Sequence, residues 1–228
     1  MSWIITGTEK YETDPYRSQV SLLLHGDGTN GSTTIVDSSP SPKTVTVVGN
    51  AQISTAQSKF GGASIAFDGT GDYLTTPSDA SLVFGANNFT IEMWIYSTSS
   101  SLGGIVDLGL NYGGVGIYQS TVEGCVVRIN SVDLISRPLF PLNQWVHLAA
   151  TRASSTLRLF YNGVQQDASV TNSTNITNGL GLAVVGAFVA AGTYYPIPQA
   201  YIDDLRITKG VARYTANFTP PTAPFPDI

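Results

Sequence analysis

The sequence predicts an all-β protein that folds as one antiparallel domain, and two observations support this prediction. Apolar and β-branched residues alternate with a period of two in several short runs, which is the pattern of strands. The 228 residues include 23 Gly and 12 Pro, and only 12% of them are charged, which is typical of strands and turns rather than of long helices. A chain of this length is within the range in which one all-β sandwich forms a single domain.

The most clearly patterned segment, residues 143–165, predicts a β-hairpin at the centre of a sheet. Residues 153–156 predict its turn, and Asn162 and Gly163 predict a second reversal because both residue types accept a positive φ. A third strand is expected to begin near Val164. The alternation places two sets of three residues each on one face of their strand: Val146, Leu148 and Ala150, and then Leu157, Leu159 and Tyr161.

Residues 89–96 predict a central strand, because both faces of this segment carry mainly apolar side chains. A strand of this kind is buried on both sides. We therefore expect the opposite sheet to cover one face, and overlying loops or a partner to cover the other. Glu92 is the one carboxylate in the segment. The two faces carry Phe89, Ile91, Met93 and Ile95, and Thr90, Glu92, Trp94 and Tyr96.

Composition excludes several classes of partner and site. The net charge of −5 and the pI near 4.8 argue against a surface for nucleic acid, which requires clustered Lys and Arg. Cys125 is the single cysteine, so no intramolecular disulfide is possible, and we expect it to be a small buried residue. The sequence shows no pattern of a signal peptide and no apolar run long enough to cross a membrane, so no membrane insertion is expected.

The order of the motifs resembles the laminin-G-like family of concanavalin A-like jelly rolls. The central motif runs Trp-x-His-x-Ala-Ala-Thr from Trp145 and continues as Leu-x-Leu-Phe-Tyr-Asn-Gly from Leu157. The resemblance implies an all-β fold of two antiparallel sheets packed as a jelly-roll sandwich. Four further segments match the family in the expected order: residues 22–28, 59–74, 89–96 and 201–207.

The resemblance divides the chain into three parts. Residues 19–214 are expected to form the laminin-G-like sandwich. Residues 1–18 are expected to be an extended N-terminal arm, and residues 215–228 an extended tail, because their prolines remove backbone donors and prevent a helix. Both terminal segments carry apolar residues that we expect to dock on another subunit or on the virion. These candidate assembly residues are Trp3, Ile4, Ile5, Phe218 and Phe225.

No catalytic residues are predicted. Relatives of laminarinase type carry the carboxylate pattern Glu-x-Asp-x-x-Glu, and this pattern does not occur in the chain, although glycoside hydrolysis requires a pair of carboxyl groups. Asp203 and Asp204 are adjacent, so on a strand they are expected to point to opposite faces. His25 and His147 are interpreted as hydrogen-bonded histidines in or near the core. We therefore expect a protein that is not an enzyme.

Many members of the family hold a structural calcium ion, and the resemblance makes Asp27, Asp37 and Asp203 the candidate ligands here. Calcium takes six to eight oxygen ligands, so loop carbonyls would have to complete the site. The alternative is that such a carboxylate accepts hydrogen bonds from backbone N–H groups and from a neighbouring arginine such as Arg206. No other cofactor is expected.

Three segments look like the laminin-G-like proteins of tailed bacteriophage particles: residues 21–34, 53–74 and 202–226. This likeness implies a virion structural protein, either decorating the capsid or forming part of a tail appendage. It would be made in the host cytoplasm without a signal peptide and displayed on the virion surface. Its expected partners are other virion proteins and further copies of itself, for example in a trimer. The sequence departs from the usual pattern at Gly26, where an aromatic residue is expected.

A second functional class also remains open, namely a carbohydrate-binding adhesin or receptor-binding module that contacts a host-surface or environmental polysaccharide. Four tyrosines in Gly- or Pro-rich segments are the candidate glycan contacts, because exposed aromatic rings stack on sugars. The alternative is that they pack at the rim of the sandwich. These residues are Tyr112, Tyr118, Tyr194 and Tyr195.

Overall fold

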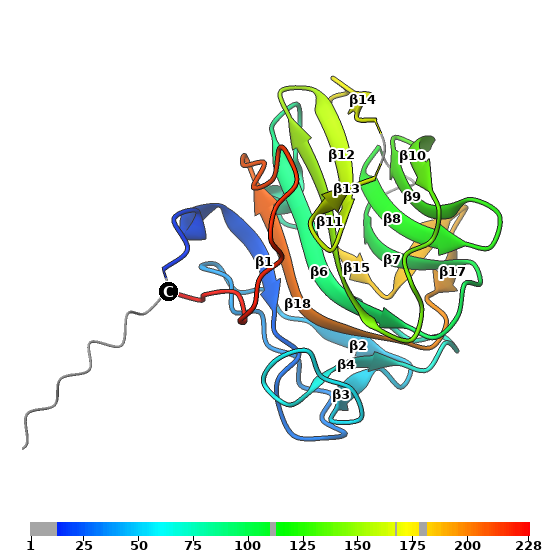
Figure 1. Ribbon diagram of the computed structural model, residues 1–228. Coiled ribbons are helices and arrows are strands. Elements are labelled where there is room, and N and C mark those ends of the chain that lie inside the picture. The colour runs from blue at the N-terminus through cyan, green and yellow to red at the C-terminus, as the bar shows by residue number, and fades with distance from the viewer. Residues whose placement is uncertain (1–12, 110–112, 167, 178–181) are drawn as a thin grey trace, which may run out of the picture.

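The computed structural model describes residues 13–109, 113–166, 168–177 and 182–228. It confirms the predicted fold class: two antiparallel sheets pack face to face as a sandwich (Figure 1). The candidate residues Trp3, Ile4, Ile5 and Tyr112 lie outside the described residues. Two short 3-10 helices, η1 (Arg17–Gln19) and η2 (Ala80–Leu82), are the helical elements of the described part. No helix found there is long and apolar enough to cross a membrane.

The larger sheet, which we call sheet I, has the strand order β13-β12-β11-β6-β18-β4-β3, with β1 paired to β18 and β14 paired to β12. The central position of β6 between β11 and β18 confirms the prediction from its two apolar faces. The strands of sheet I are β1 (Val20–Leu24), β3 (Gln52–Ser54), β4 (Ser64–Phe67), β6 (Phe89–Ser97), β11 (Trp145–Ala153), β12 (Thr156–Tyr161), β13 (Val164–Gln165), β14 (Val170–Thr171) and β18 (Ala200–Lys209).

The second sheet, sheet II, has the order β10-β9-β8-β7-β15-β5-β2, and a separate hairpin pairs β16 with β17. Its strands are β2 (Thr46–Val48), β5 (Tyr73–Thr75), β7 (Gly103–Leu108), β8 (Val115–Ser120), β9 (Gly124–Ile129), β10 (Val132–Arg137) and β15 (Val184–Val185), and the hairpin consists of β16 (Ala187–Ala190) and β17 (Thr193–Pro196).

The predicted hairpin of residues 143–165 is confirmed in detail. Strands β11 and β12 pair antiparallel down to Ala153 opposite Thr156. The two turn residues, Ser154 and Ser155, both have positive φ, which matches the right-handed twist of the flanking strands. Asn162 and Gly163, with φ of 47° and 76°, make the second reversal into β13.

The core lies between the two sheets and follows the predicted alternation. All six residues assigned to the inner faces of β11 and β12 belong to it, as do Phe89, Ile91, Met93 and Ile95 of β6. Cys125 on β9 is a buried free thiol in the same core, and burial raises its pKa to about 12.

The C-terminal segment packs on the sandwich of its own chain, which corrects the expectation that it is an assembly arm. Phe225 is 4% exposed and packs with Val20 and Leu23. The Phe218 ring stacks on Tyr214 with centroids 3.5 Å apart. The last segment therefore runs across the outer face of sheet I, where it is drawn in red in Figure 1. Phe225 is thus covered by its own sheet, and Phe218 packs on Tyr214 of the same chain.

The described end of the N-terminal segment also contacts the sandwich. Asp14 is 7% exposed, and its backbone N–H donates to the carbonyl of Ile228 at 3.2 Å. Its carboxylate accepts hydrogen bonds from Arg206 on β18 and from Arg213. Residues 13–18 are therefore not a free arm, and both ends of the described chain meet on sheet I.

Candidate functional site

Three aromatic side chains form a row across the outer face of sheet I. Trp145 of β11 pairs with Tyr96 of β6, and Tyr96 pairs with Tyr201 of β18. Their sequence neighbours Ile95 and Ile202 point into the core, so alternation places the three rings on the opposite side. Because adjacent strands lie about 4.8 Å apart, the row extends about 10 Å across the sheet. We call these three residues the aromatic row.

The rings of the aromatic row support one another and remain partly exposed. The centroids of Tyr96 and Trp145 are 5.8 Å apart, and those of Tyr96 and Tyr201 are 6.0 Å apart, both edge to face. Edge-to-face contact is favourable because of the quadrupoles of the rings. Each of the three residues is of intermediate exposure. A row of half-buried rings of this kind is a rigid apolar surface that a ligand can reach.

The same pairing continues from the aromatic row into a polar hollow. Tyr201 pairs with Ala66 of β4, which pairs with Gln52 of β3. The hollow beside them has a volume of about 500 Å³, and Tyr201 forms part of its wall. Its polar lining is rich in amides and hydroxyls, which can both donate and accept hydrogen bonds. The polar residues of this lining are Thr33, Asn50, Gln52, Ser54, Asp68 and Gln199.

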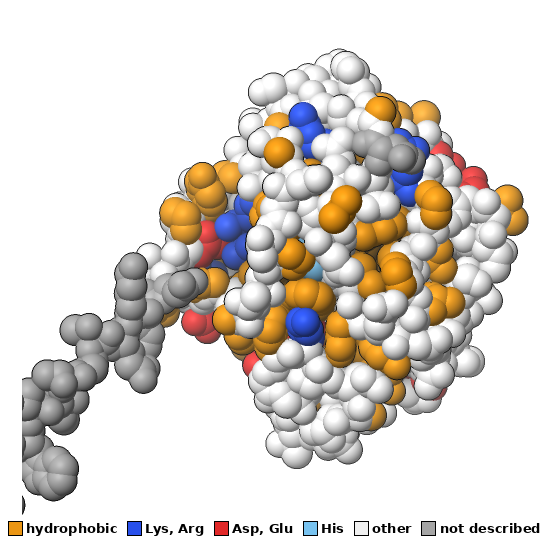
Figure 2. Space-filling view, in the orientation of Figure 1, with side chains coloured by type: hydrophobic (Ala, Val, Ile, Leu, Met, Phe, Trp, Pro, Cys, Tyr) orange, Lys and Arg blue, Asp and Glu red, His pale blue; other side chains and the backbone are white. Residues whose placement is uncertain are grey.

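The neighbouring row on the same face, in which Trp94 pairs with His147 and Asp203, is covered by other side chains. Trp94 is 5% exposed, because the Lys59 ammonium lies 3.8 Å from the centre of its ring and Phe60 packs edge to face against it. Figure 2 shows hydrophobic side chains gathered around a basic group over the middle of this sheet. Farther along the same face, Tyr214 and Phe218 of the C-terminal segment pack on His147 and Phe160. Of the aromatic residues that the strands place on this face, those of the aromatic row are the ones that remain partly exposed.

Aromatic rings next to convergent amides, hydroxyls and a carboxylate suit a ligand with both apolar faces and many polar groups. Small-molecule sites usually combine an apolar wall with a few polar groups. Here the aromatic row supplies the apolar part and the hollow supplies the polar part, and its 500 Å³ is within the usual range of volumes. The sequence patterns placed Tyr96 on the same face of its strand as Glu92 and Trp94, but they did not single out Trp145 or Tyr201 as site residues. Trp145 and Tyr201 lie beside Tyr96 only because of the pairing of β11 and β18 with β6, which the sequence patterns did not predict.

The four tyrosines predicted as glycan contacts have different surroundings. Tyr118 lies on β8 and is 2% exposed. Its hydroxyl lies 3.0 Å from Glu123, Asp133 and Arg128, so the prediction that it is an exposed loop residue is wrong. Tyr194 and Tyr195 lie on β17; Tyr194 is 40% exposed and stacks on Tyr73, whereas Tyr195 stacks on Phe188.

The three candidate calcium ligands are not brought together. Asp37 accepts hydrogen bonds from the backbone N–H groups of Leu23, Ser39 and Lys43, and from the Ser39 hydroxyl. Its carboxylate is therefore saturated by its own surroundings. Among the residues that the structure describes, no group of three or more His, Cys, Asp or Glu could hold a metal ion. The proposed grouping of Asp27, Asp37 and Asp203 is thus wrong.

A β-bulge explains the surroundings of Asp203. The pairing of β18 with β6 shifts between Asp203 and Arg206, and Asp204 has a φ of 51°. Asp203 accepts the backbone N–H groups of Lys59 and Phe60, while Asp204 contacts His25 at 2.5 Å and accepts the N–H of Phe225. Both carboxylates therefore lie on the outer side of sheet I, which corrects the expectation of opposite faces.

The surroundings created by the bulge shift the pKa values of Asp203 and His25. Burial raises the pKa of Asp203 to about 7, although the N–H groups of Phe60 and Lys59 lower it, and the neighbouring charges of Asp204 and Asp27 raise it further. Burial lowers the pKa of His25, but the carboxylate of Asp204 outweighs this effect and the net pKa is raised.

The buried carboxylates are not arranged as a catalytic pair that substrate can reach. Glu92 is 0% exposed and Asp203 and Asp204 are each 1% exposed. Burial favours a protonated Glu92, but Arg206, His147 and the Tyr214 hydroxyl outweigh it and hold its pKa at about 2. A carboxyl group that stays ionised and enclosed cannot act as a general acid at neutral pH.

Comparisons with known proteins agree with this fold. Residues 68–213 match the laminin G model described as the concanavalin A-like lectin/glucanases superfamily. No curated protein matches the sequence.

Several solved structures are similar. The binding domain of Paraclostridial Mosquitocidal Protein 1 has a TM-score of 0.66 at 16% identity, over 86% of this chain and 50% of that one. A structure of botulinum neurotoxin type C, a toxin whose cell entry is described as dependent on interaction with two ganglioside molecules, has a TM-score of 0.61 at 17% identity, over 86% of this chain and 49% of that one. This chain thus spans about half of the toxin chains.

Domain 4 of an extracellular arabinanase from Geobacillus stearothermophilus, solved with arabinotriose, has a TM-score of 0.62 at 19% identity. That match covers 84% of this chain and 93% of the arabinanase domain. At these identities the likeness is one of fold.

Proposed function

Because the chain belongs to the concanavalin A-like lectin/glucanases superfamily, we propose that it is a non-catalytic glycan-binding sandwich carried on the particle of a tailed bacteriophage. The observation that carries the glycan-binding part is the aromatic row of Trp145, Tyr96 and Tyr201, which leads into the amide- and hydroxyl-lined hollow. The rings offer flat apolar surfaces for the C–H faces of a sugar, and the hollow offers partners for its hydroxyl groups.

Two similar structures support a saccharide as the ligand. The arabinanase domain was solved with arabinotriose, and the type C neurotoxin is described as interacting with gangliosides. The arabinanase domain is the more informative relative, because this chain covers most of its length. The proposed binding site in this chain rests on its own residues.

The non-catalytic part of the proposal rests on burial. The acidic residues of β6 and β18 are enclosed, and each accepts hydrogen bonds from fixed partners. Cleavage of a glycosidic bond requires two carboxyl groups at the bond itself. A bound saccharide on the aromatic row would meet rings, amides and hydroxyls instead.

The virion location rests on the phage-like segments of the sequence. The C-terminal segment is engaged with its own sheet, so the candidate attachment residues that remain are Trp3, Ile4 and Ile5. Deletion of residues 1–12 should reduce incorporation into particles, and a melting curve checks that the truncated protein still folds. Normal loading of the truncated protein would contradict an attaching role for this segment. The mass of the purified protein in solution tests the proposed homo-oligomer, for example a trimer.

Glycan binding is tested by a glycan array followed by calorimetry with the best ligand. Tyr201→Ala and Trp145→Ala should each lower the affinity by about tenfold, equivalent to about 1.4 kcal/mol, while melting as the wild type does. Tyr194→Ala is the matched comparison, because it also removes a partly exposed tyrosine, but from β17. If Tyr194→Ala abolishes binding and Tyr201→Ala does not, the glycan lies at the pair of Tyr73 and Tyr194 and the aromatic row is not the site.

A further inference from the structure

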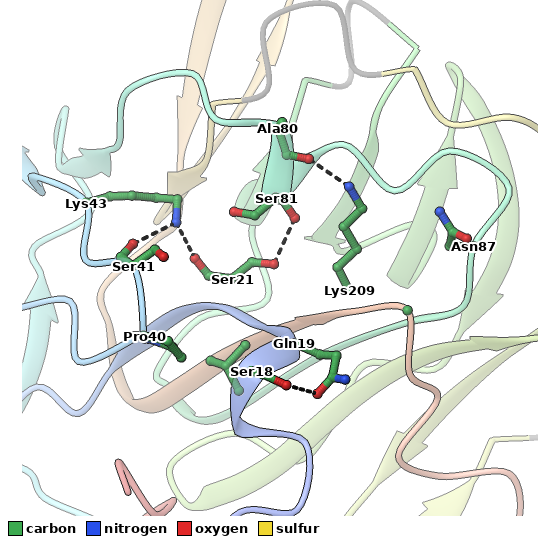
Figure 3. Close-up of a pocket in the computed structure, with 12 residues that line it drawn as sticks. Ser18, Gln19, Ser21, Pro40, Ser41, Lys43, Ala80, Ser81, Asn87 and Lys209 are labelled. Carbon is green, nitrogen blue, oxygen red and sulfur yellow. Dashed lines mark hydrogen bonds between the residues drawn. The ribbon is translucent and has the colours of Figure 1, made fainter.

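A second hollow lies at the other end of β18 from Tyr201. Its volume is about 480 Å³, and η1, β1, η2 and the loop before β2 contribute to its walls together with the end of β18 (Figure 3). Tyr201 and Lys209 are eight residues apart on β18, so the two hollows lie about 25 Å apart at the usual rise of a strand. The polar residues of this lining, apart from its two lysines, are Ser18, Gln19, Ser21, Ser41, Ser81 and Asn87.

Two lysines give this hollow its charge. The Lys43 ammonium donates to the carbonyls of Ser21 at 2.7 Å and Ser41 at 3.2 Å, and the Lys209 ammonium donates to the carbonyl of Ala80 at 2.8 Å. Each ammonium has three protons, so one donor of Lys43 and two of Lys209 remain for a ligand. Figure 3 shows the two lysines on either side of Ser21 and Ser81. Within the described ranges, the lining contains no carboxylate.

The carboxylate of Asp79 lies just outside the lining and reduces its positive charge. The carboxylate of Asp79 accepts the backbone N–H of Ser81 at 2.7 Å. Hydrogen bonds from Ser81 lower the pKa of Asp79 most, and the charges of Lys43 and Lys209 lower it further. Asp37, whose carboxylate accepts the backbone N–H of Lys43, and Arg17 of η1 offset each other. The two lysines and Asp79 therefore leave one net positive charge around the hollow. The Ser81 side chain and its backbone N–H both interact with Asp79, so this carboxylate is held at the edge of the hollow.

We propose that this hollow binds a sugar residue that carries one negative charge, as a carboxylate or as a sulfate ester. The ammonium groups of Lys43 and Lys209 would pair with the anion, and the serine hydroxyls and the amides of Gln19 and Asn87 would bind the sugar hydroxyls. A nucleic acid does not suit the site, because two lysines in a chain of net charge −5 cannot neutralise a run of phosphates. This site is separate from the aromatic row and does not require it.

The test uses calorimetry at low salt with three defined trisaccharides. Trigalacturonate carries carboxylates, its methyl ester is the neutral matched control, and a sulfated trisaccharide carries the alternative anion. At least one of the two anionic sugars should bind, the methyl ester should not, and added salt should weaken binding because the pocket is open to solvent. Whichever of the two anionic sugars binds shows whether the site prefers a carboxylate or a sulfate ester.

Variants locate the site. Lys43→Gln and Lys209→Gln should each weaken binding of the anionic sugar by about fivefold or more, as loss of a charged hydrogen bond does. Glutamine keeps a donor for the carbonyls, and melting curves confirm that the variants fold. Arg158→Gln, which removes a positive charge from β12 outside this lining, should leave the affinity unchanged. Tyr201→Ala should also retain binding, which separates this site from the aromatic row.

Three results would overturn the proposal. The first is that neither anionic sugar binds, and the second is that the methyl ester binds as tightly as trigalacturonate. The third is that Arg158→Gln weakens binding as much as the two lysine variants, which would mean that only the overall charge of the protein matters.

Discussion

The guanidinium of Arg206 donates from Nε to Oε1 of Glu92 at 2.9 Å, and both side chains are buried on the outer side of sheet I. The pair holds both ends of the described chain to the sheet. Asp14, before η1, accepts from Arg206 and Arg213, and the hydroxyl of Tyr214 donates to Glu92 at 2.7 Å. A buried carboxylate on a central strand therefore helps to hold the terminal segments in place.

Glu92→Leu should strongly destabilise the protein. Removing one partner of a buried ion pair leaves the other charge uncompensated, which typically costs about 3–5 kcal/mol. Chemical denaturation gives the free energy of unfolding. Glu123→Gln is the control, because Glu123 is exposed and its replacement should cost less than about 1 kcal/mol. A loss of the same small size for Glu92→Leu would show that the network does not support the fold.

Phe225→Ala should lower the stability of the isolated protein. The ring is buried with Val20 and Leu23, and the Arg206 guanidinium lies 3.7 Å from its centre, so truncation should cost about 3–5 kcal/mol. Ile228→Ala is the control, because Ile228 is 54% exposed. If Phe225→Ala melts as the wild type does but fails to enter particles, the segment is an attachment arm after all.

The free energy of unfolding should be greatest near pH 4–5 and fall on both sides. Glu92 has its pKa lowered from 4.5 to about 2, so its contribution is present above pH 4.5 and is lost as the pH falls through the lowered pKa. Asp203 has its pKa raised from 3.8 to about 7, so its contribution is present below pH 3.8 and is lost as the pH rises to 7.

His25, with a pKa raised from 6.5, adds a further loss above neutrality. Denaturation at intervals from pH 3 to 9 measures this profile. A maximum at pH 8 would contradict it.

Asp203→Asn should stabilise the protein at pH 8 and change little at pH 4. The amide oxygen can still accept the N–H groups of Lys59 and Phe60, but it carries no charge to bury. The gain at pH 8 should be roughly 1–3 kcal/mol. Asp37→Asn is the contrasting variant: both oxygens of Asp37 accept hydrogen bonds, so it should destabilise at both values. A destabilising Asp203→Asn at pH 8 would show that the ionised form is the favoured one.

Local pattern was sufficient to predict the strands and turns of the central hairpin. The period of two correctly grouped the residues that share a face of β6, β11 and β12, and Asn162-Gly163 identified a turn, because these features depend on neighbours in sequence. The same reasoning was wrong for Tyr118, which neighbouring glycines suggested to be in a loop. The structure places it in β8 with a buried ring.

Alternation and composition were enough to predict the all-β class, the sets of residues that share a face of each central strand, and the burial of Glu92 and Cys125. Only the tertiary structure decided where the C-terminal segment lies, because its apolar residues gain as much by packing on their own sheet as on another subunit.

The residues of both candidate sites are brought together only by the tertiary structure. The aromatic row exists because three strands from distant parts of the chain pair in one register, and the lysine hollow exists because β1, η2 and the end of β18 converge. The bulge at Asp204 shifted the alternation that sequence reasoning assumed. Pairing register and bulges depend on contacts between segments far apart in the chain, and no local pattern encodes them.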